Sequence, residues 1–134
     1  MSHQFTLIVG YLGRDPEMDY TASGQARTRF SVATNRKYRN SAGEEERETT
    51  WFNVTAWGKQ AETCNAYLHK GSQVLVQGRL VPDPDTGSPH IWSRHDGTPA
   101  TSFEVSAETV RFLGGNNGNG SEENATAQKD EIPF

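Results

Sequence analysis

Two tryptophans set among small polar residues are the feature of this sequence that most clearly suggests a binding surface. Trp51 and Trp57 lie in a segment whose side chains alternate in character, as in a strand with two different faces. One face carries Trp51, Asn53, Thr55 and Trp57, and the other carries Phe52, Val54 and Ala56. The second set is typical of a core, whereas the first suits a surface on which flat rings stack. The alternative is that one or both tryptophans pack under a loop or against another subunit.

A third ring, Tyr38, stands in a basic run with Arg36, Lys37 and Arg39. Single-strand nucleic-acid binders combine cations that hold phosphates with rings that stack on bases, at about 1–3 kcal/mol per base. Alternation puts Tyr38 on the same face as Phe30, a predicted core residue, so we expect a bulge or the twist of the strand to turn it outward. The alternative interpretation is a solvated basic hairpin.

Trp92 is a further candidate, since it lies between two basic side chains and precedes Asp96-Gly97, a dipeptide typical of hairpin turns. Loop tryptophans also plug the open ends of barrels. Several cations stand at the ends of predicted elements, where ordinary surface charges are also common. The candidate nucleic-acid contacts are Tyr38, Trp51, Trp57, Trp92, Arg36, Lys37, Arg39, Lys59, Lys70 and Arg79.

Catalysis finds little support in the residue pattern. The four histidines are scattered, and the spacing of His90 and His95 has no acid pair nearby to suggest a metal site. The single cysteine, Cys64, excludes an internal disulfide and falls on the apolar side of a predicted helix, as a buried small hydrophobe would. We expect no catalytic residue, no metal and no cofactor.

The elements that must position these side chains are mostly strands. Strand patterns cover residues 5–12, 26–38, 49–57, 73–81 and 101–113, with a turn at residues 41–44 and a proline-rich loop at residues 82–89. A helix is predicted over residues 59–70, with Lys70 in its last turn and Gly71 as its stop. Five strands with one helix between the third and fourth predict an all-β fold, the OB-fold barrel.

Charge is distributed unevenly along the 134 residues, whose formal net charge is −4. Residues 114–134 contain four acids and one lysine, so the tail holds −3 of that total and residues 1–113 hold −1. We predict a folded domain over residues 1–113 and a disordered Gly/Asn-rich linker over residues 114–129. No apolar run approaches the roughly 20 residues that span a bilayer, so we expect a soluble protein with no membrane partner.

The last five residues, Asp130, Glu131, Ile132, Pro133 and Phe134, place two acids before an apolar terminal residue. At the end of a flexible tether this arrangement is typical of a docking peptide, whose ring enters a pocket while its carboxylates meet Arg or Lys of a partner protein. A purely solubilising acidic end would explain the charge but not the Ile-Pro-Phe.

The motifs together closely resemble the bacterial single-stranded DNA-binding protein family over nearly the whole chain. The resemblance rests on residues 10–17 (GYLGRDPE), 30–34 (FSVAT), 50–51 (TW), 56–62 (AWGKQAE), 67–74 (YLHKGSQV) and the 130–134 tip. Tyr38, Trp51, Trp57 and Trp92 fall at positions that resemble the family's base-stacking aromatics, and Lys59 and Lys70 match basic positions. Tyr38 stands where Trp is frequent in the family, and Trp57 where Phe is frequent. The loop over residues 81–91 is longer than is usual in the family, and the linker is shorter.

The resemblance implies a non-enzymatic, cytoplasmic and nucleoid-associated homotetramer that binds and protects single-stranded DNA with little sequence preference. It also implies that the tip recruits replication, recombination and repair proteins. Two other hypotheses stay open: an OB-fold adaptor subunit of a replication-restart complex whose main ligand is protein, and an OB-fold hydrolase, which the lack of a catalytic constellation disfavours.

Overall fold

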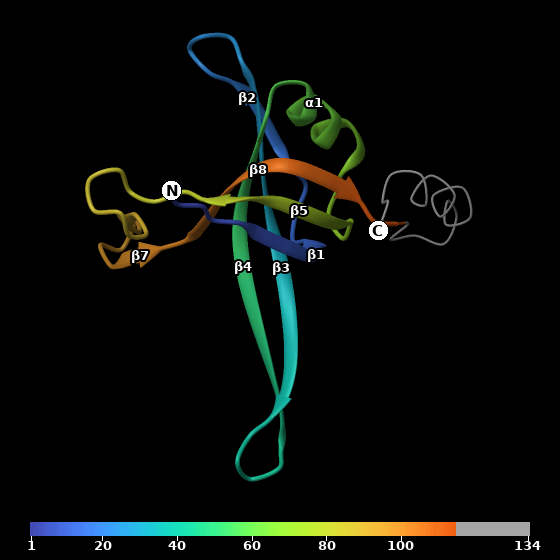
Figure 1. The fold of residues 1–134 in the computed structure, drawn as a ribbon, viewed down its shortest axis with the longest axis vertical. Helices are drawn as coiled ribbons and strands as arrows, with labels where there is room; N and C mark the ends of the chain where they lie inside the picture. Colours follow the sequence, from blue (N-terminus) through green and yellow to red (C-terminus); the bar gives the residue numbers. More distant parts are fainter. Residues whose placement is uncertain (115–134) are drawn as a thin grey trace.

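Five strands close a barrel in the computed structural model of the protein, which describes residues 1–114 (Figure 1). Around the barrel they follow the order β1 (Thr6–Leu12), β5 (Gln73–Leu80), β8 (Phe103–Phe112), β4 (Glu45–Trp57) and β3 (Ala26–Arg39). The circle closes where β1 also pairs with β3, at Tyr11↔Ala33 and Leu12↔Val32. The pairing of β4 with β8 is parallel and the others are antiparallel. The predicted five-stranded OB-fold is therefore confirmed.

Three short strands add to this barrel. β2 (Glu17–Tyr20) extends the sheet beside β3, while β6 (Ile91–Ser93) and β7 (Pro99–Thr101) form a separate hairpin that projects to one side (Figure 1). The predicted turn at Asp96-Gly97 connects β6 and β7, closed by a 2.8 Å hydrogen bond from the Arg94 amide to the Thr98 carbonyl. Strand β2 was not predicted, because its four residues carry no run of β-forming side chains.

The predicted alternation along β4 is confirmed. Val54 and Ala56 are at most 1% exposed and Phe52 packs partly buried against the core, whereas Trp51 and Trp57 are on the outside. The other strands supply further small aliphatic side chains to the same core. The largest fully buried side chains are Val32, Val54, Val74, Val76 and Val105, together with Thr28 and Cys64.

The helix α1 (Gly58–Tyr67) lies between β4 and β5, as predicted, but it ends three residues earlier than expected. Leu68 is buried, so the apolar period continues past the helix, but its backbone is already extended (φ −92°, ψ 150°). Lys70 is therefore outside the last turn of the helix. Gly71, at φ 91°, belongs to a later turn, and its own amide donates to the Leu12 carbonyl. No helix within residues 1–114 is long and apolar enough to cross a bilayer.

The side chain of Gln60 joins α1 to an irregularity in the sheet. The register of β5 and β8 skips Glu108, passing from Gly78↔Ala107 to Gln77↔Thr109. The Gln60 amide bonds the backbone of β8 at this point: its Oε1 accepts from the Val110 amide at 2.8 Å, and its Nε2 donates to the Glu108 carbonyl at 3.4 Å. A helix side chain thus satisfies backbone groups next to the irregularity.

The β3–β4 hairpin extends well beyond the barrel, and we call residues 35–49 the arm (Figure 1). Its register is continuous from Arg27↔Trp57 to Arg39↔Glu45, so the bulge considered for Tyr38 is absent from this ladder. Tyr38 keeps the parity of the core residue Phe30 and is nevertheless exposed, because the side chains at residues 35–39 and 45–49 extend past the barrel. Parity predicts burial only where a second layer covers that face.

Candidate nucleic-acid interface

The outer face of β3 and β4 brings aromatic, polar and basic side chains together in paired rows. Trp57 lies opposite Arg27, and Trp51 lies opposite the small Ala33. The rows between them pair Thr55 with Arg29 and Asn53 with Ser31. Trp51 is 51% exposed and Trp57 is 36% exposed, so both indoles have free surface on the barrel wall. This is the arrangement predicted from the alternation of residues 51–57.

Trp51 is held against the turn that follows β1. A Cβ added to Gly13 would lie 2.5 Å from Cζ3 and 2.7 Å from Cη2 of the Trp51 indole, so the ring rests directly on the glycine backbone. The Gly13 amide is itself fixed by a 3.1 Å hydrogen bond to the Ser31 carbonyl. The missing side chain at residue 13 therefore sets the position of the indole and leaves the rest of the ring accessible.

Tyr38 lies in the arm and has a different environment. The Arg36 guanidinium is 4.5 Å from the centre of the tyrosine ring, and its Nε donates to Glu48 Oε1 at 3.0 Å. Strand alternation places Lys37 and Arg39 on the opposite face of the arm, so only Arg36 contacts the ring. The basic run of residues 36–39 thus brings one cation to the ring and not three.

Four cations of this surface were not identified from the sequence. Arg27 and Arg29 lie on the outer face, Arg47 lies opposite Lys37 in the arm, and Arg14 lines a polar hollow together with Arg29. Alternation could have identified Arg29, which has the parity opposite to Phe30 in the same strand. Arg47 could be placed only with the hairpin register, which the sequence did not fix.

Asp19 on β2 neutralises part of this basic surface. Its carboxylate accepts two hydrogen bonds from Arg27, at 2.9 and 2.8 Å, and one from Arg29 at 3.4 Å. The hydrogen bonds from Arg27 lower the pKa of Asp19 below its ordinary value of 3.8, so the carboxylate is charged at neutral pH. Asp19 thus neutralises part of the positive charge of Arg27 and Arg29 in the unbound protein.

The remaining candidates are spread around this face. Arg79 belongs to the row of Arg29 and Thr55, through the pairings Thr55↔Ser106 and Ser106↔Arg79. Lys59 is exposed in the first turn of α1, two residues after Trp57. Lys70 is exposed in the turn after the helix, where its backbone amide donates to Asp15 Oδ1 at 2.8 Å. The geometry therefore groups Arg79 with the tryptophan face and puts Lys70 beside the turn that follows β1.

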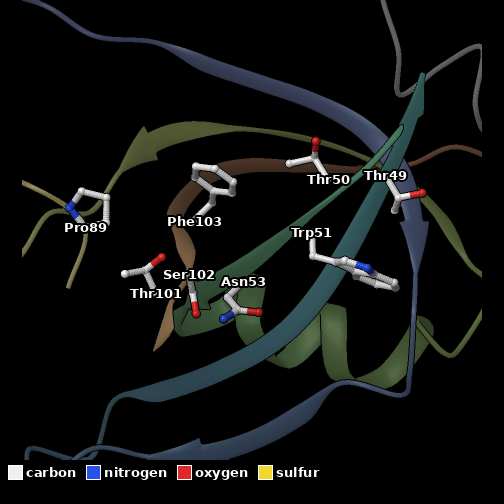
Figure 2. Close-up of a pocket in the computed structure, with 8 residues that line it drawn as sticks. All are labelled: Thr49, Thr50, Trp51, Asn53, Pro89, Thr101, Ser102 and Phe103. Atoms are coloured by element: carbon white, nitrogen blue, oxygen red, sulfur yellow. The ribbon is translucent and has the colours of Figure 1, made fainter. Parts of the chain in front are cut away.

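Trp92 projects from β6 and is 44% exposed, so the barrel does not bury it as a plug. Its indole Nε1 donates to Ser102 Oγ at 3.4 Å, and the Arg94 guanidinium lies 6.0 Å from its ring centre. Ser102 also borders a hollow of about 300 Å³ that reaches Trp51 (Figure 2). The hollow is lined by Thr49, Thr50, Trp51, Asn53, Pro89, Thr101, Ser102 and Phe103.

The histidines, acids and cysteine of the described residues form no metal-binding cluster. Within residues 1–114 no group of three or more His, Cys, Asp or Glu side chains converges on one point. His90 contacts a single acid, with 2.8 Å between its Nδ1 and Asp83 Oδ2. Burial raises the pKa of Cys64 to about 12, which makes its thiol a poor nucleophile at neutral pH. The predicted linker beyond residue 114 and the tip, Asp130 to Phe134, lie outside the described residues.

The sequence profile of the single-strand binding protein family matches residues 3–113. The chain belongs to this family. Among its relatives, the single-stranded DNA-binding protein 1 of Chlorobaculum tepidum is 45% identical over 74 residues, which are 55% of this chain and 46% of that protein. The single-stranded DNA-binding protein of Neisseria meningitidis is 35% identical over 119 residues, which are 89% of this chain and 64% of that protein. The chain thus spans about half to two thirds of the length of these relatives.

Solved structures include proteins of similar fold. The protein in a Plasmodium falciparum SSB complex with ssDNA superposes with a TM-score of 0.67 at 24% identity, covering 84% of this chain and 96% of that one. At this identity the likeness concerns the fold, and it agrees with the OB-fold barrel described above.

Proposed function

We propose that this chain is a non-enzymatic protein that binds single-stranded DNA with little sequence preference. The observation that carries the proposal is the outer face of β3 and β4, where Trp51 and Trp57 lie exposed among cations and small polar side chains. Membership in the single-strand binding protein family and the names of its relatives support the same ligand. In the cell, such a protein would protect unpaired strands during replication, recombination and repair.

In this proposal the bases stack on exposed rings and the phosphates meet nearby cations. Every base has a π-face, so stacking tolerates any sequence. The rings are Tyr38, Trp51, Trp57 and Trp92, and the cations are Arg36, Lys37, Arg39, Lys59, Lys70 and Arg79, to which the fold adds Arg14, Arg29 and Arg47. Because the net charge of residues 1–113 is only −1, the placement of these cations matters more than the total charge.

Titration of the full chain with a dT oligonucleotide tests this function. Stacking should quench the intrinsic tryptophan fluorescence to saturation, and affinity should fall with rising salt as counterions are released. A duplex of the same length is the control and should bind far more weakly, since its bases are not free to stack. The absence of saturable quenching with dT would reject the proposal.

We further propose that the chain assembles into a homotetramer through the outer face of β1. Leu7, Val9 and Tyr11 point outward from this strand and are each about half exposed, beside the more exposed Phe5. An apolar sheet face of this kind suits contact with a second copy of the chain. Light scattering should give the mass of four chains with or without DNA, and a monomeric mass would contradict the assembly.

For the end of the chain we propose a linker over residues 114–129 and a protein-docking tip over residues 130–134. The acidic tip would recruit enzymes of replication, recombination and repair, and it would compete with DNA for the cations of the domain over residues 1–113. Deletion of residues 130–134 should abolish capture of such partners and raise DNA affinity modestly at low salt. Unchanged DNA affinity would count against the competition, and negligible DNA affinity of both forms would favour an adaptor whose main ligand is protein.

We also propose that the protein lies in the cytoplasm, associated with the nucleoid, because its proposed ligand is single-stranded DNA. Fractionation of cells that produce the full chain should recover it with chromosomal DNA. Treatment of the fraction with a single-strand-specific nuclease should release it, and recovery in the membrane fraction would contradict this location.

A further inference from the structure

Strand β4 and the segment that leads into β8 diverge at the hollow drawn in Figure 2. The parallel pairing of β4 with β8 begins at Phe52↔Phe103. Before that point, residues 49–51 of β4 pair with β3 on one side, and on the other side they border the hollow together with Thr101 and Ser102. The hollow, about 300 Å³, is therefore a wedge between β4 and the segment that leads into β8, and not a cavity inside the barrel.

Phe103 presents an open aromatic ring to this wedge. It is the first residue of β8 and has the parity of the core residues Val105 and Ala107, but it lies where the barrel ends and is 53% exposed. One side of the ring packs on Phe52, with ring centres 5.8 Å apart and planes tilted by 40°. Figure 2 shows the ring on one side of β4, whereas Trp51 projects from the other side.

The wedge is continuous with the proposed DNA face at both of its ends. Trp51 forms part of its lining. At the other end Ser102 accepts the 3.4 Å hydrogen bond from the indole of Trp92. The wedge therefore offers a path between Trp51 and Trp92.

The chemistry of the lining suits a base better than a phosphate. None of its eight side chains is charged, and one of them, Asn53, donates from Nδ2 to the Glu104 carboxylate at 3.1 Å. A carboxylate at the border repels a phosphate, since both are anions. In contrast, a base finds the ring of Phe103, the hydroxyl of Ser102 and the backbone groups of residues 49–51 on the side that β8 leaves unpaired.

We propose that this wedge is a nucleobase subsite in which one unpaired base stacks on Phe103. This inference rests on the proposed binding of single-stranded DNA and adds a fifth aromatic position to it. The subsite tolerates any base because the ring contacts the π-face, while Ser102 and the free edge of β4 meet the polar rim of the base. It also connects the barrel wall to the β6–β7 hairpin, so both bind one continuous strand.

The test uses the full chain and a fluorescein-labelled dT oligonucleotide, with affinity measured by anisotropy at several salt concentrations. Phe103→Leu, which keeps apolar bulk but has no ring, should lower the affinity about 5-fold or more, whereas Phe103→Tyr should retain it. The slope of log affinity against log salt should stay unchanged in both variants, because no phosphate contact is removed. Tyr20→Ala, which removes a 59% exposed ring from β2, is the matched control and should bind as the parent does.

Each outcome decides the inference. Phe103→Leu binding as tightly as the parent would overturn the subsite, since the ring would then serve only to pack on Phe52. A loss shared equally by the Leu and Tyr variants would do the same. A parent chain that does not bind dT at all would reject the proposed function itself, and urea unfolding of each variant shows whether a lost affinity reflects a lost fold.

Discussion

Trp51 and Tyr38 belong to the same hairpin, but they are held in different ways. Trp51 rests on the backbone of Gly13, beside the closed barrel, and 51% of its surface is exposed. Tyr38 lies in the arm, where its neighbours are the guanidinium of Arg36 and the carboxylate of Glu48 that Arg36 contacts. The barrel therefore fixes the first ring through packing, whereas the second depends on charges that salt screens.

This difference predicts how each ring responds to its surroundings. A ring positioned by a packed backbone is pre-organised, so stacking a base on it costs little further ordering. A ring positioned by an exposed ion pair is less well fixed, since such pairs contribute only about 0–1 kcal/mol. Trp51 should then provide the larger share of the affinity, and Tyr38 a smaller and more salt-sensitive share.

Removal of the barrel-held ring should have the largest effect. We expect Trp51→Ala to lower the affinity for a dT oligonucleotide by about 5- to 150-fold, from about 1–3 kcal/mol of lost stacking. Anisotropy of a labelled oligonucleotide measures this without relying on the indole fluorescence. Trp51→Phe is the control and should recover most of the affinity, because a smaller ring still stacks. Equal binding by the parent and the Ala variant would remove Trp51 from the interface.

Displacement of the same ring without removing it should come next. Gly13→Ala would put a methyl group about 2.5 Å from the indole of Trp51, which must move away. The affinity should fall several-fold, toward that of Trp51→Ala, and urea unfolding should change little because the ring edge can shift. The double variant Gly13→Ala/Trp51→Ala should bind no more weakly than Trp51→Ala alone. Additive losses in the double variant would contradict positioning through the indole.

Removal of the arm-held ring should cost less. We expect Tyr38→Ala to lower the affinity by no more than about 5-fold, near the lower limit for one stacked base. One reason is that Arg36, freed from the ring, remains available to a phosphate. The loss should add to that of Trp51→Ala, because the two rings share no contact. A loss larger than that of Trp51→Ala would reverse the proposed ranking of the barrel and the arm.

The smallest effect should come from the ion pair in the arm. Glu48→Gln removes the charge that pairs with Arg36 at 3.0 Å, so the guanidinium can meet a phosphate. Affinity at low salt should rise about twofold, within the range expected for an exposed ion pair, and the gain should disappear as salt is raised. Glu62→Gln, which alters an exposed acid on α1, is the control for net charge and should show a smaller gain. A gain that persists at high salt would contradict the electrostatic explanation.

The sequence predicted the parts of the molecule where one face of a strand covers the core. Phe52, Val54 and Ala56 were assigned inward because β4 alternates cleanly, and the helix was placed correctly through Ala61 and Cys64. Its end was placed wrongly because Leu68 is buried by an extended backbone, and an apolar period does not distinguish that backbone from another helical turn.

Positions beyond the barrel were not predictable in the same way. Tyr38 and Phe103 have the parity of core residues and yet are exposed, since the strand continues past the layer that would cover them. Lys37 lies opposite Arg47 only because of the hairpin register. Trp51 contacts Gly13 because a turn distant in the sequence lies beside it. Alternation carries no information about either.

The amide of Gln60 makes one backbone position of β8 report on the helix. The Val110 amide proton is bonded to a side chain from α1, at 2.8 Å. Its hydrogen exchange therefore follows the undocking of α1, whereas exchange at ladder amides of β8 follows the opening of the barrel. A single residue in the last strand can thus separate, in one exchange experiment, the local stability of the helix from the global stability of the domain.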